Sequence, residues 1–329
     1  MFTRDRYARD MTRIGFHASH EQFPPGELLR LAAHAEASGF DAVMCSDHFH
    51  PWSRRQGQSG HAWTWLGAAM ATTSCSYGVV NAPVGRYHPA VIAQAAATLD
   101  AMFPDRFWLA AGSGEALNER MAGPWPDKSE RNRRLLEAVE VMRALWRGEC
   151  VDHQGAFRVD QARLFTRPVK PPLVFVPALS EKTAKWGAEW ADGLITVSQP
   201  LEKLRPIVEA FRNHGGAGKP VYLQVKLSYA TDEATALREA HEQWATNVLE
   251  PALSEDVGTP QAYEALAEQV TPQQVAKAVH VSADADQHVE WLQTYLDMGV
   301  DALYLHNVST RQKEFIDVFA RDVLPRLRR

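Results

Sequence analysis

Three polar residues, Ser46, Asp47 and His48, follow an apolar run and form the part of this sequence best suited to chemistry. The run at 40–44 is typical of a buried strand. In an α/β barrel the active site lies at the carboxyl ends of the strands, which is where such residues would lie. An imidazole there can move protons near neutral pH, and a neighbouring carboxylate can set its tautomer. His48 is therefore the first candidate catalytic residue.

The His48-x-His50 pattern also suits a metal-dependent hydrolase, in which two histidines bind one ion. That interpretation needs further histidines and an aspartate at later strand ends. The polar residues found at those ends are Glu115, Ser180, Ser198 and His306. Because this set is incomplete, we expect no metal site and keep the hydrolase as an alternative. For His50 alone, an ordinary loop position is the simpler interpretation.

The segment 112–119, Gly-Ser-Gly-Glu-Ala-Leu-Asn-Glu, offers a second set of candidate residues. Glycines after a strand let the backbone approach a ligand closely. No third glycine follows at the dinucleotide spacing, which excludes a Rossmann motif. In an aromatic pocket, desolvation would favour neutral Glu115, which could act as a general acid. Its alternative role is a first-turn charge that complements a helix dipole. Asn118 could donate to a ring carbonyl or nitrogen.

Two further strand ends are candidates for ligand contacts. Ser180 stands where a strand gives way to a helix, and its hydroxyl, the free backbone N–H groups and Lys182 would suit a phosphate. An ordinary N-cap explains Ser180 equally well. The apolar pair Val79 and Val80 leads into a proline turn, so its backbone could press against a flat ring.

Strand and helix patterns alternate along the chain and predict a TIM-type (β/α)8 barrel. The expected strands are 12–18, 40–46, 76–82, 107–111, 173–178, 193–197, 220–229 and 302–306. The expected helices are 26–38, 89–102, 130–147, 180–190, 201–214, 285–298 and 312–324. We also expect a hairpin insertion at 151–165, turning at Gly155, and a mostly helical excursion at 231–281 that is longer than a normal connection. No linker or repeat is visible, so residues 1–329 are interpreted as one domain.

Composition narrows the class of protein. The 329 residues are 45% hydrophobic and 23% charged with a net charge of −5, which indicates a globular protein without a nucleic-acid surface. No apolar run is long enough to span a bilayer, and the N-terminal segment is not a secretory signal. The three cysteines are widely spaced, which suggests reduced thiols in a cytoplasmic protein.

Three motifs in the same order carry a resemblance to a known family. They are Ser-Asp-His-Phe-His-Pro-Trp at 46–52, Arg-Tyr-His-Pro-Ala-Val-Ile-Ala-Gln at 86–94, and the segment at 112–119. Together they resemble the luciferase-like flavin oxidoreductase superfamily. Within it, the chain is most similar to the branch of deazaflavin-dependent glucose-6-phosphate dehydrogenases. The resemblance runs from about Thr12 to Arg328.

The resemblance implies a flavin-type ring in the barrel mouth and a role for each matching residue. Asp47 and Asn118 match flavin contacts, and His48 matches the base that takes the proton of the substrate hydroxyl as hydride leaves for the ring. Trp52 and Glu115 match residues that flank and protonate that centre. A non-proline cis peptide behind the ring is also typical, and it would fall at Val79-Val80.

The chain departs from that branch at positions that bind phosphate and the flavin. Pro200 and Ala265 stand where lysines hold the sugar phosphate, so glucose 6-phosphate is not the expected substrate. Leu179-Ser180 replaces a pair of glycines near the flavin. These changes favour FMN slightly over the deazaflavin coenzyme F420. FMN would allow monooxygenase chemistry, whereas a deazaflavin would make the protein a dehydrogenase or reductase.

The sequence thus predicts a cytoplasmic flavin-dependent oxidoreductase that acts on a small organic molecule. The substrate is expected to be largely apolar, because Phe49, Trp52, Trp63 and Trp65 are expected near the mouth. We expect no nucleic acid or membrane partner. A homodimer is expected because luciferase-like barrels usually associate. The alternative from another class is a flavin-binding or sensor protein without turnover.

Overall fold

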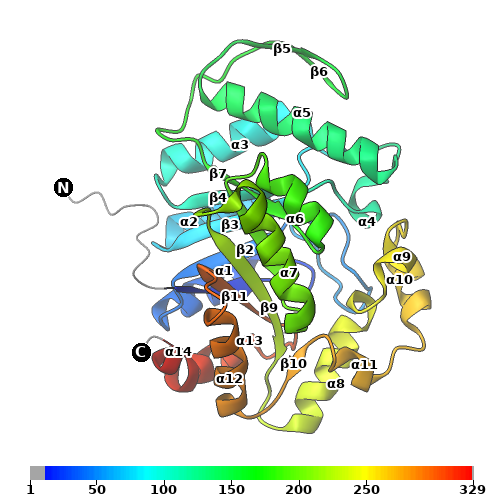
Figure 1. Ribbon diagram of the computed structural model, residues 1–329. Coiled ribbons are helices and arrows are strands. Elements are labelled where there is room, and N and C mark those ends of the chain that lie inside the picture. Colours follow the sequence, from blue (N-terminus) through cyan, green and yellow to red (C-terminus); the bar gives the residue numbers. More distant parts are fainter. Residues whose placement is uncertain (1–11, 328–329) are drawn as a thin grey trace, which may run out of the picture.

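Eight parallel strands close into a barrel in the computed structural model, which describes residues 12–327 (Figure 1). Neighbouring strands follow the chain order, and the last pairing, between β9 and β8, closes the sheet on itself. The barrel strands are β1 (Arg13–Ala18), β2 (Ala42–Ser46), β3 (Ser76–Asn81), β4 (Phe107–Ala111), β7 (Leu173–Pro177), β8 (Gly193–Val197), β9 (Val221–Ser228) and β11 (Ala302–Asn307). The TIM-type prediction is confirmed, and every expected strand is present to within two residues at each end.

Helices cover the outside of the barrel. They are α1 (Pro25–Ala37), α2 (Ala62–Thr72), α3 (Pro89–Met102), α5 (Lys128–Trp146), α6 (Glu181–Ala188), α7 (Leu201–Phe211), α12 (Ala285–Leu296), α13 (Gln312–Val318) and α14 (Leu324–Leu327). Short π-helical segments, η1 (Arg212–Gly216) and η3 (Phe319–Val323), extend α7 and α13. The sequence analysis missed α2, because this helix is apolar almost all round and shows no amphipathic stripe.

Alternate side chains of each strand face the barrel interior, where a layer of large residues fills the lower part. Its members include Met44, Trp108, Phe175, Tyr222 and Tyr304. The Trp108 indole donates to the Tyr304 hydroxyl at 3.1 Å. Gly78 makes room for this ring, since a Cβ there would lie 1.9 Å from Trp108 Cε2. The lower part of the interior is therefore a packed core, and in barrels of this type ligands bind at the carboxyl ends of the strands.

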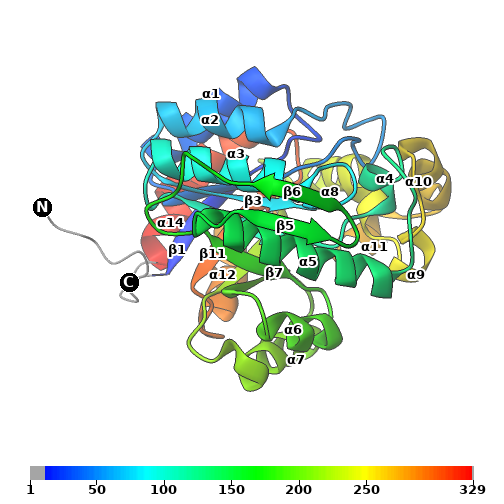
Figure 2. The ribbon, with the colours of Figure 1, turned by 90° about the horizontal axis from the view of Figure 1, so that it is seen from above.

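The two predicted insertions are confirmed and lie in different places. Strands β5 (Val151–Gln154) and β6 (Arg158–Ala162) form the antiparallel hairpin, which packs on the outer face of α5 (Figure 2). Glu137 of α5 accepts from Ala156 N at 2.8 Å and contacts His153 Nε2 at 3.0 Å. The hairpin is thus remote from the barrel mouth.

The helical excursion lies at the carboxyl ends of the strands, beside the short helix α4 (Ala116–Glu119). Its elements are α8 (Glu233–Trp244), the 3-10 turn η2 (Ala245–Asn247), α9 (Pro251–Ser254), α10 (Pro260–Ala267), α11 (Pro272–Val275) and β10 (His280–Val281). Trp125 Nε1 donates to Asp256 Oδ1 at 2.9 Å, and Arg131 pairs with Glu255 at 2.6 Å. These contacts hold the excursion against the segment that follows β4.

The expected cis peptide at Val79-Val80 is absent, and no cis bond occurs anywhere in residues 12–327. Both valines continue the regular parallel pairing of β3 with β2 and with β4. The Val79 side chain is fully buried in the layer between sheet and helices. Val80 is partly exposed and packs on the interior layer, so only Val80 presents its side chain to the mouth.

Two expectations from composition concern the state of the cysteines and the absence of a membrane-spanning segment. Cys45, Cys75 and Cys150 are all free thiols. Among the helices between residues 12 and 327, none is long and apolar enough to cross a membrane. The single domain and the cytoplasmic location stay predictions.

Candidate active site

His48 lies in the loop after β2, at the carboxyl end of the barrel. The chain continues the sheet pairing by one residue, since Asp47 N donates to Val80 O at 2.9 Å. Ser59 then donates its hydroxyl to His48 O at 2.8 Å. The imidazole is 14% exposed. The backbone thus holds His48 at the edge of the mouth with little freedom to turn away.

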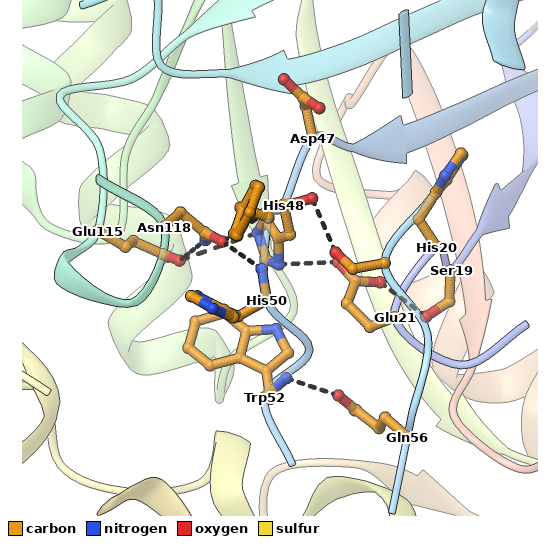
Figure 3. Close-up of polar contacts among 12 residues, drawn as sticks. Ser19, His20, Glu21, Asp47, His48, His50, Trp52, Gln56, Glu115 and Asn118 are labelled. Atoms are coloured by element: carbon orange, nitrogen blue, oxygen red, sulfur yellow. Dashed lines mark hydrogen bonds and ion pairs between the residues drawn. The ribbon is translucent and has the colours of Figure 1, made fainter. Parts of the chain in front are cut away.

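Asn118 ties this loop to α4 (Figure 3). Its Oδ1 accepts from Phe49 N at 2.8 Å and from His50 N at 3.2 Å, and its side chain is buried. Its Nδ2 lies 3.5 Å from Glu115 Oε2, which is a weak contact. The carbonyl oxygen of Asn118 is therefore occupied by the protein, and only the amide N–H groups are left for the predicted contact with a ring.

Glu21 is the partner of His48 that the sequence analysis missed. Its Oε1 lies 2.8 Å from His48 Nδ1, and its Oε2 accepts from the Ser19 hydroxyl at 2.9 Å. The residue follows β1, where the polar run His17-Ala-Ser-His-Glu-Gln22 begins near the strand end. The rule that pointed to His48, polar residues at a strand's carboxyl end, would also have found Glu21.

The ion pair sets the charge of His48. Burial alone would disfavour the imidazolium, but the Glu21 carboxylate, together with smaller contributions from Glu115 and Asp47, outweighs burial and raises the pKa of His48 to about 9. Burial also opposes the charge on Glu21, yet the adjacent imidazolium holds the pKa of Glu21 below its usual range. At neutral pH the pair is therefore an imidazolium beside a carboxylate, with Nδ1 as the nitrogen nearer to Glu21.

Glu115 lies on the other side of the same imidazole. Its Oε2 is 3.8 Å from His48 Nε2, and its side chain is about half exposed, at 49%. The surrounding walls raise the pKa of Glu115 by desolvation, although the nearby His48 charge opposes this. Glu115 precedes α4 as its N-cap but makes no side-chain cap hydrogen bond. Figure 3 shows His48 between the two carboxylates, so protons can pass on its Nε2 side.

Trp52 forms a wall next to His48. The two rings meet edge to face with centroids 5.3 Å apart, and Trp52 meets Tyr263 of α10 in the same way at 5.2 Å. Trp52 N also donates to Gln56 Oε1 at 2.9 Å, which steadies the turn. The helical excursion therefore supplies part of the site wall through Tyr263.

The expectation that four aromatic residues lie near the mouth is half wrong. Phe49, which is 47% exposed, and Trp52 belong to the loop of His48. Trp63 and Trp65 lie in α2 and are buried between that helix and the sheet, where they contact Phe107 and Tyr77 respectively. Both rings turn into the core because α2 packs that face against the sheet.

Asp47 has one oxygen that the protein leaves unused. Its Oδ2 accepts from Asn81 Nδ2 at 2.9 Å and from Arg86 Nη2 at 3.2 Å, and Arg86 also donates to Asp47 O at 2.7 Å. Its Oδ1 is buried and has no hydrogen-bond partner in the described structure. A buried carboxylate oxygen without a donor is costly. A ligand with a ring N–H or a hydroxyl would satisfy it.

Comparison with known proteins assigns the family of this fold and site. A model of the family described as luciferase-like monooxygenase matches residues 10–302. The chain belongs to this family. The F420-dependent glucose-6-phosphate dehydrogenase of Nakamurella multipartita is 38% identical, with 96% of each chain covered. The enzyme of the same name from Nocardia farcinica is also 38% identical, over 96% of this chain and 98% of its own.

A solved structure is similar in fold over nearly the whole length. It is an F420-dependent secondary alcohol dehydrogenase in complex with an F420-acetone adduct. It has a TM-score of 0.89 and 31% identity, and the match covers 97% of this chain and 99% of that one. The prediction of an oxidoreductase of the luciferase-like class is confirmed. The preference for FMN over F420 receives no support from these relatives.

Ser180 lies at the start of α6 in this luciferase-like barrel. Its hydroxyl accepts from Thr183 N at 3.3 Å, as an N-cap does, and the side chain is exposed. The structure thus shows the capping role that the sequence left as one of two interpretations. A contact with a cofactor phosphate at this helix end stays a prediction.

The floor of the mouth carries a second polar group that sequence reasoning did not use. His17 of β1 and His306 of β11 are buried, with ring centroids 4.1 Å apart. Gln224 Nε2 of β9 lies 3.1 Å from His17 Nδ1 and 3.3 Å from His306 Nδ1. Burial lowers the pKa of His17 to about 3 and that of His306 well below its usual value, so both rings are neutral. Of these two histidines, the sequence points only to His306, which ends an expected strand.

Proposed function

We propose that this protein is an F420-dependent dehydrogenase or reductase that interconverts a small secondary alcohol and its ketone. The observation that carries the proposal is the row Glu21–His48–Glu115, which presents a proton-exchanging imidazole nitrogen to the barrel mouth. Similarity over the whole chain to enzymes named as F420-dependent dehydrogenases supports the proposal.

The residues around the mouth fit a flavin-type ring. The unpaired Asp47 Oδ1 would accept from the ring, and the amide of Asn118 would donate to it. Val80 would lie against its face, and Ser180 with the N-terminus of α6 would contact the phosphate of the tail. When bound, F420 supplies two-electron hydride transfer. We propose F420 in place of FMN because the relatives that cover the whole chain are named for F420.

The charge of His48 decides which direction the site favours. With its pKa raised to about 9, His48 is protonated at neutral pH and can give the Nε2 proton to a ketone oxygen. Alcohol oxidation needs the neutral imidazole, which accepts the hydroxyl proton at Nε2 while Glu21 keeps the proton on Nδ1. Glu115, whose Oε2 is 3.8 Å from Nε2 and whose pKa is raised by desolvation, lies where it can exchange that proton with the mouth.

We propose that glucose 6-phosphate is not the substrate, although relatives at 38% identity are named for it. Pro200 and Ala265 stand at the positions that the resemblance matches to phosphate-binding lysines. A phosphate dianion there would lose its charge-assisted contacts, each worth about 1.5–3 kcal/mol.

The test is an anaerobic assay of the purified protein with F420 and, separately, with FMN. We expect F420 alone to bind tightly and raise the melting temperature. Its absorbance should bleach with secondary alcohols, return when a ketone is added, and change little with glucose 6-phosphate. Faster turnover of glucose 6-phosphate or tighter binding of FMN would contradict the proposal. A flavin-binding protein without turnover would bind F420 but leave its spectrum unchanged by every substrate.

We further propose a homodimer, since luciferase-like barrels usually associate. Light scattering of the F420-loaded protein at several concentrations tests this, and a monomer at all concentrations would contradict it. The dimer carries no part of the argument about the site.

A further inference from the structure

Lys226 of β9 is a cation in the mouth that the proposed mechanism does not use. Side chains of a strand alternate, so Lys226 lies on the same face as Tyr222, which belongs to the interior layer. Its Nζ lies 5.4 Å from the centre of the Trp244 ring. Within residues 12–327, no carboxylate oxygen approaches this Nζ to within 4.0 Å, and no hydrogen bond is made by it. The side chain is only partly exposed.

The surroundings of Lys226 suit a small anion. Burial lowers the pKa of Lys226 to about 8, and Glu115 opposes this shift from across the mouth. The amine is therefore still mostly charged at neutral pH. Neutral donors lie beside it, because the His17–His306 pair and the Gln224 amide line the same floor. A partly dehydrated cation that makes no close ion pair attracts an anion more strongly than a surface lysine does.

We propose that Lys226 binds a carboxylate of the substrate, so that the alcohol oxidised at His48 is a secondary hydroxy acid and the product is its keto acid. This inference rests on the proposed function. A carboxylate fits better than a phosphate, because one cation with neutral donors matches a single negative charge. Oxidation converts the C–O bond to C=O. The carbon-bound hydrogen leaves with its electron pair to reduce F420, and the hydroxyl proton goes to His48 Nε2.

The experiment compares hydroxy acids with their methyl esters, using the F420-loaded protein and the variants Lys226→Met and Lys128→Met. Lys128 is the matched control, since it also influences the charge of Glu115 but contacts Ser113 at the rim. We expect the wild-type protein to prefer the acid. Lys226→Met should lower kcat/KM for the acid by about tenfold or more, mainly through KM, the scale of one charge-assisted contact. It should change ester oxidation by no more than about twofold, and Lys128→Met should leave the preference intact.

Binding of butyrate, measured by calorimetry on the same loaded proteins, separates this inference from the proposed function. Butyrate should bind the wild-type and Lys128→Met proteins but not Lys226→Met, whether or not any alcohol is oxidised. Absence of all turnover would therefore overturn the proposed function while the calorimetry still decides the role of Lys226. Equal losses for acid and ester, equal butyrate binding in all three proteins, or preference for a phosphate monoester over the carboxylate would each overturn the carboxylate site. Melting temperatures of the variants establish that all three are folded.

Discussion

The two halves of the barrel mouth differ in chemistry. The half formed by β1, β2, β9 and β11 carries the groups that titrate or donate, either on the strands or directly after them. These groups are His17, Glu21, His48, Gln224, Lys226 and His306. The half formed by β3, β4, β7 and β8 ends in partly exposed residues without a titratable side chain. They are Val80, Gly112, Pro177 and Val197.

This difference indicates that the first half serves proton transfer and the second half packs against a planar ring. We call them the polar half and the apolar half. Charged groups stabilise one another on the first half, as the pair Glu21–His48 does at 2.8 Å. The second half presents a smooth apolar surface, where Gly112 and Pro177 lie so close that a Cβ on the glycine would be 3.2 Å from the proline Cγ. A planar ring needs an apolar surface of this kind to pack against. A substrate with a hydroxyl group needs the charged and polar groups of the first half. Glu115 and Asn118 from the segment after β4, and Arg86 from the loop after β3, reach across the division between the two halves.

The largest expected effect follows from removing the imidazole of the polar half. His48→Ala should lower kcat by about 10²–10⁴-fold, the usual contribution of a positioned acid–base group. F420 binding, measured by fluorescence titration, should stay within about twofold, since the apolar half is intact. His50→Ala is the control, because His50 contacts Leu117 O at 2.8 Å and not the proposed reacting atoms. Full turnover by His48→Ala would contradict the role of the polar half in proton transfer.

The next largest effect is expected from removing the Glu21 carboxylate, which keeps His48 protonated. Wild-type alcohol oxidation should rise with pH until about 9, because only neutral His48 accepts a proton, and ketone reduction should fall over the same range. Glu21→Gln removes the carboxylate, so the pKa of His48 should fall to about 6.5 or below. The rising limb of the oxidation profile should then move by about 2.5 pH units or more toward acid. Glu119→Gln, which alters a contact of Arg86, serves as control. An unmoved profile in Glu21→Gln would show that another group titrates.

A smaller effect is expected at the junction of the two halves. Asp47→Asn replaces one oxygen that accepts from Arg86 and Asn81 and one oxygen without a partner. We expect F420 to bind about tenfold more weakly, because a charge-assisted contact is lost. The pH profile of turnover should keep its shape and move slightly toward acid, because Asp47 also raises the pKa of His48. Tighter binding of F420 by this variant would show that Asp47 Oδ1 does not face the ring.

The smallest effect is expected on the apolar half. Val80→Ala removes apolar surface worth about 0.8 kcal/mol per buried CH2 group, so the Kd for F420 should rise only a few-fold. The pH profile and the preference for a substrate should not change. Val79→Ala is the contrasting variant, since Val79 is buried in the outer layer and its truncation should lower the melting temperature instead. A changed pH profile in Val80→Ala would mean that the halves are not independent.

Much of the site was predictable because its signals are local. Asp47, His48, Trp52, Glu115 and Asn118 follow strand ends that the alternation of apolar and polar residues defines, and the structure brings all five together at one edge. Helix α2 was not predicted, because its apolar residues cover nearly the whole circumference of the helix.

The features that the sequence did not predict share one cause. The direction of a side chain and the residues that it contacts depend on how the strands pair in the sheet. Trp63 and Trp65 turn away from the mouth because of the rotation of α2. Lys226 lies inside an expected strand, and which face it takes depends on the register of β9 with β11 and β8. The Val79-Val80 bond is trans in a regular ladder, which only the pairing on both sides reveals.

The sequence by itself determined the order of strands and helices, the class of fold and the residues at the strand ends, because periodicity and turn chemistry act over a few neighbours. The tertiary structure decided which of those residues meet. Glu21 reaches His48 only because β1 and β2 are adjacent, and His306 reaches His17 only because barrel closure places β11 beside β1. The charge of His48 is a consequence of that pairing and of burial, and neither can be read from the residues near it in the chain.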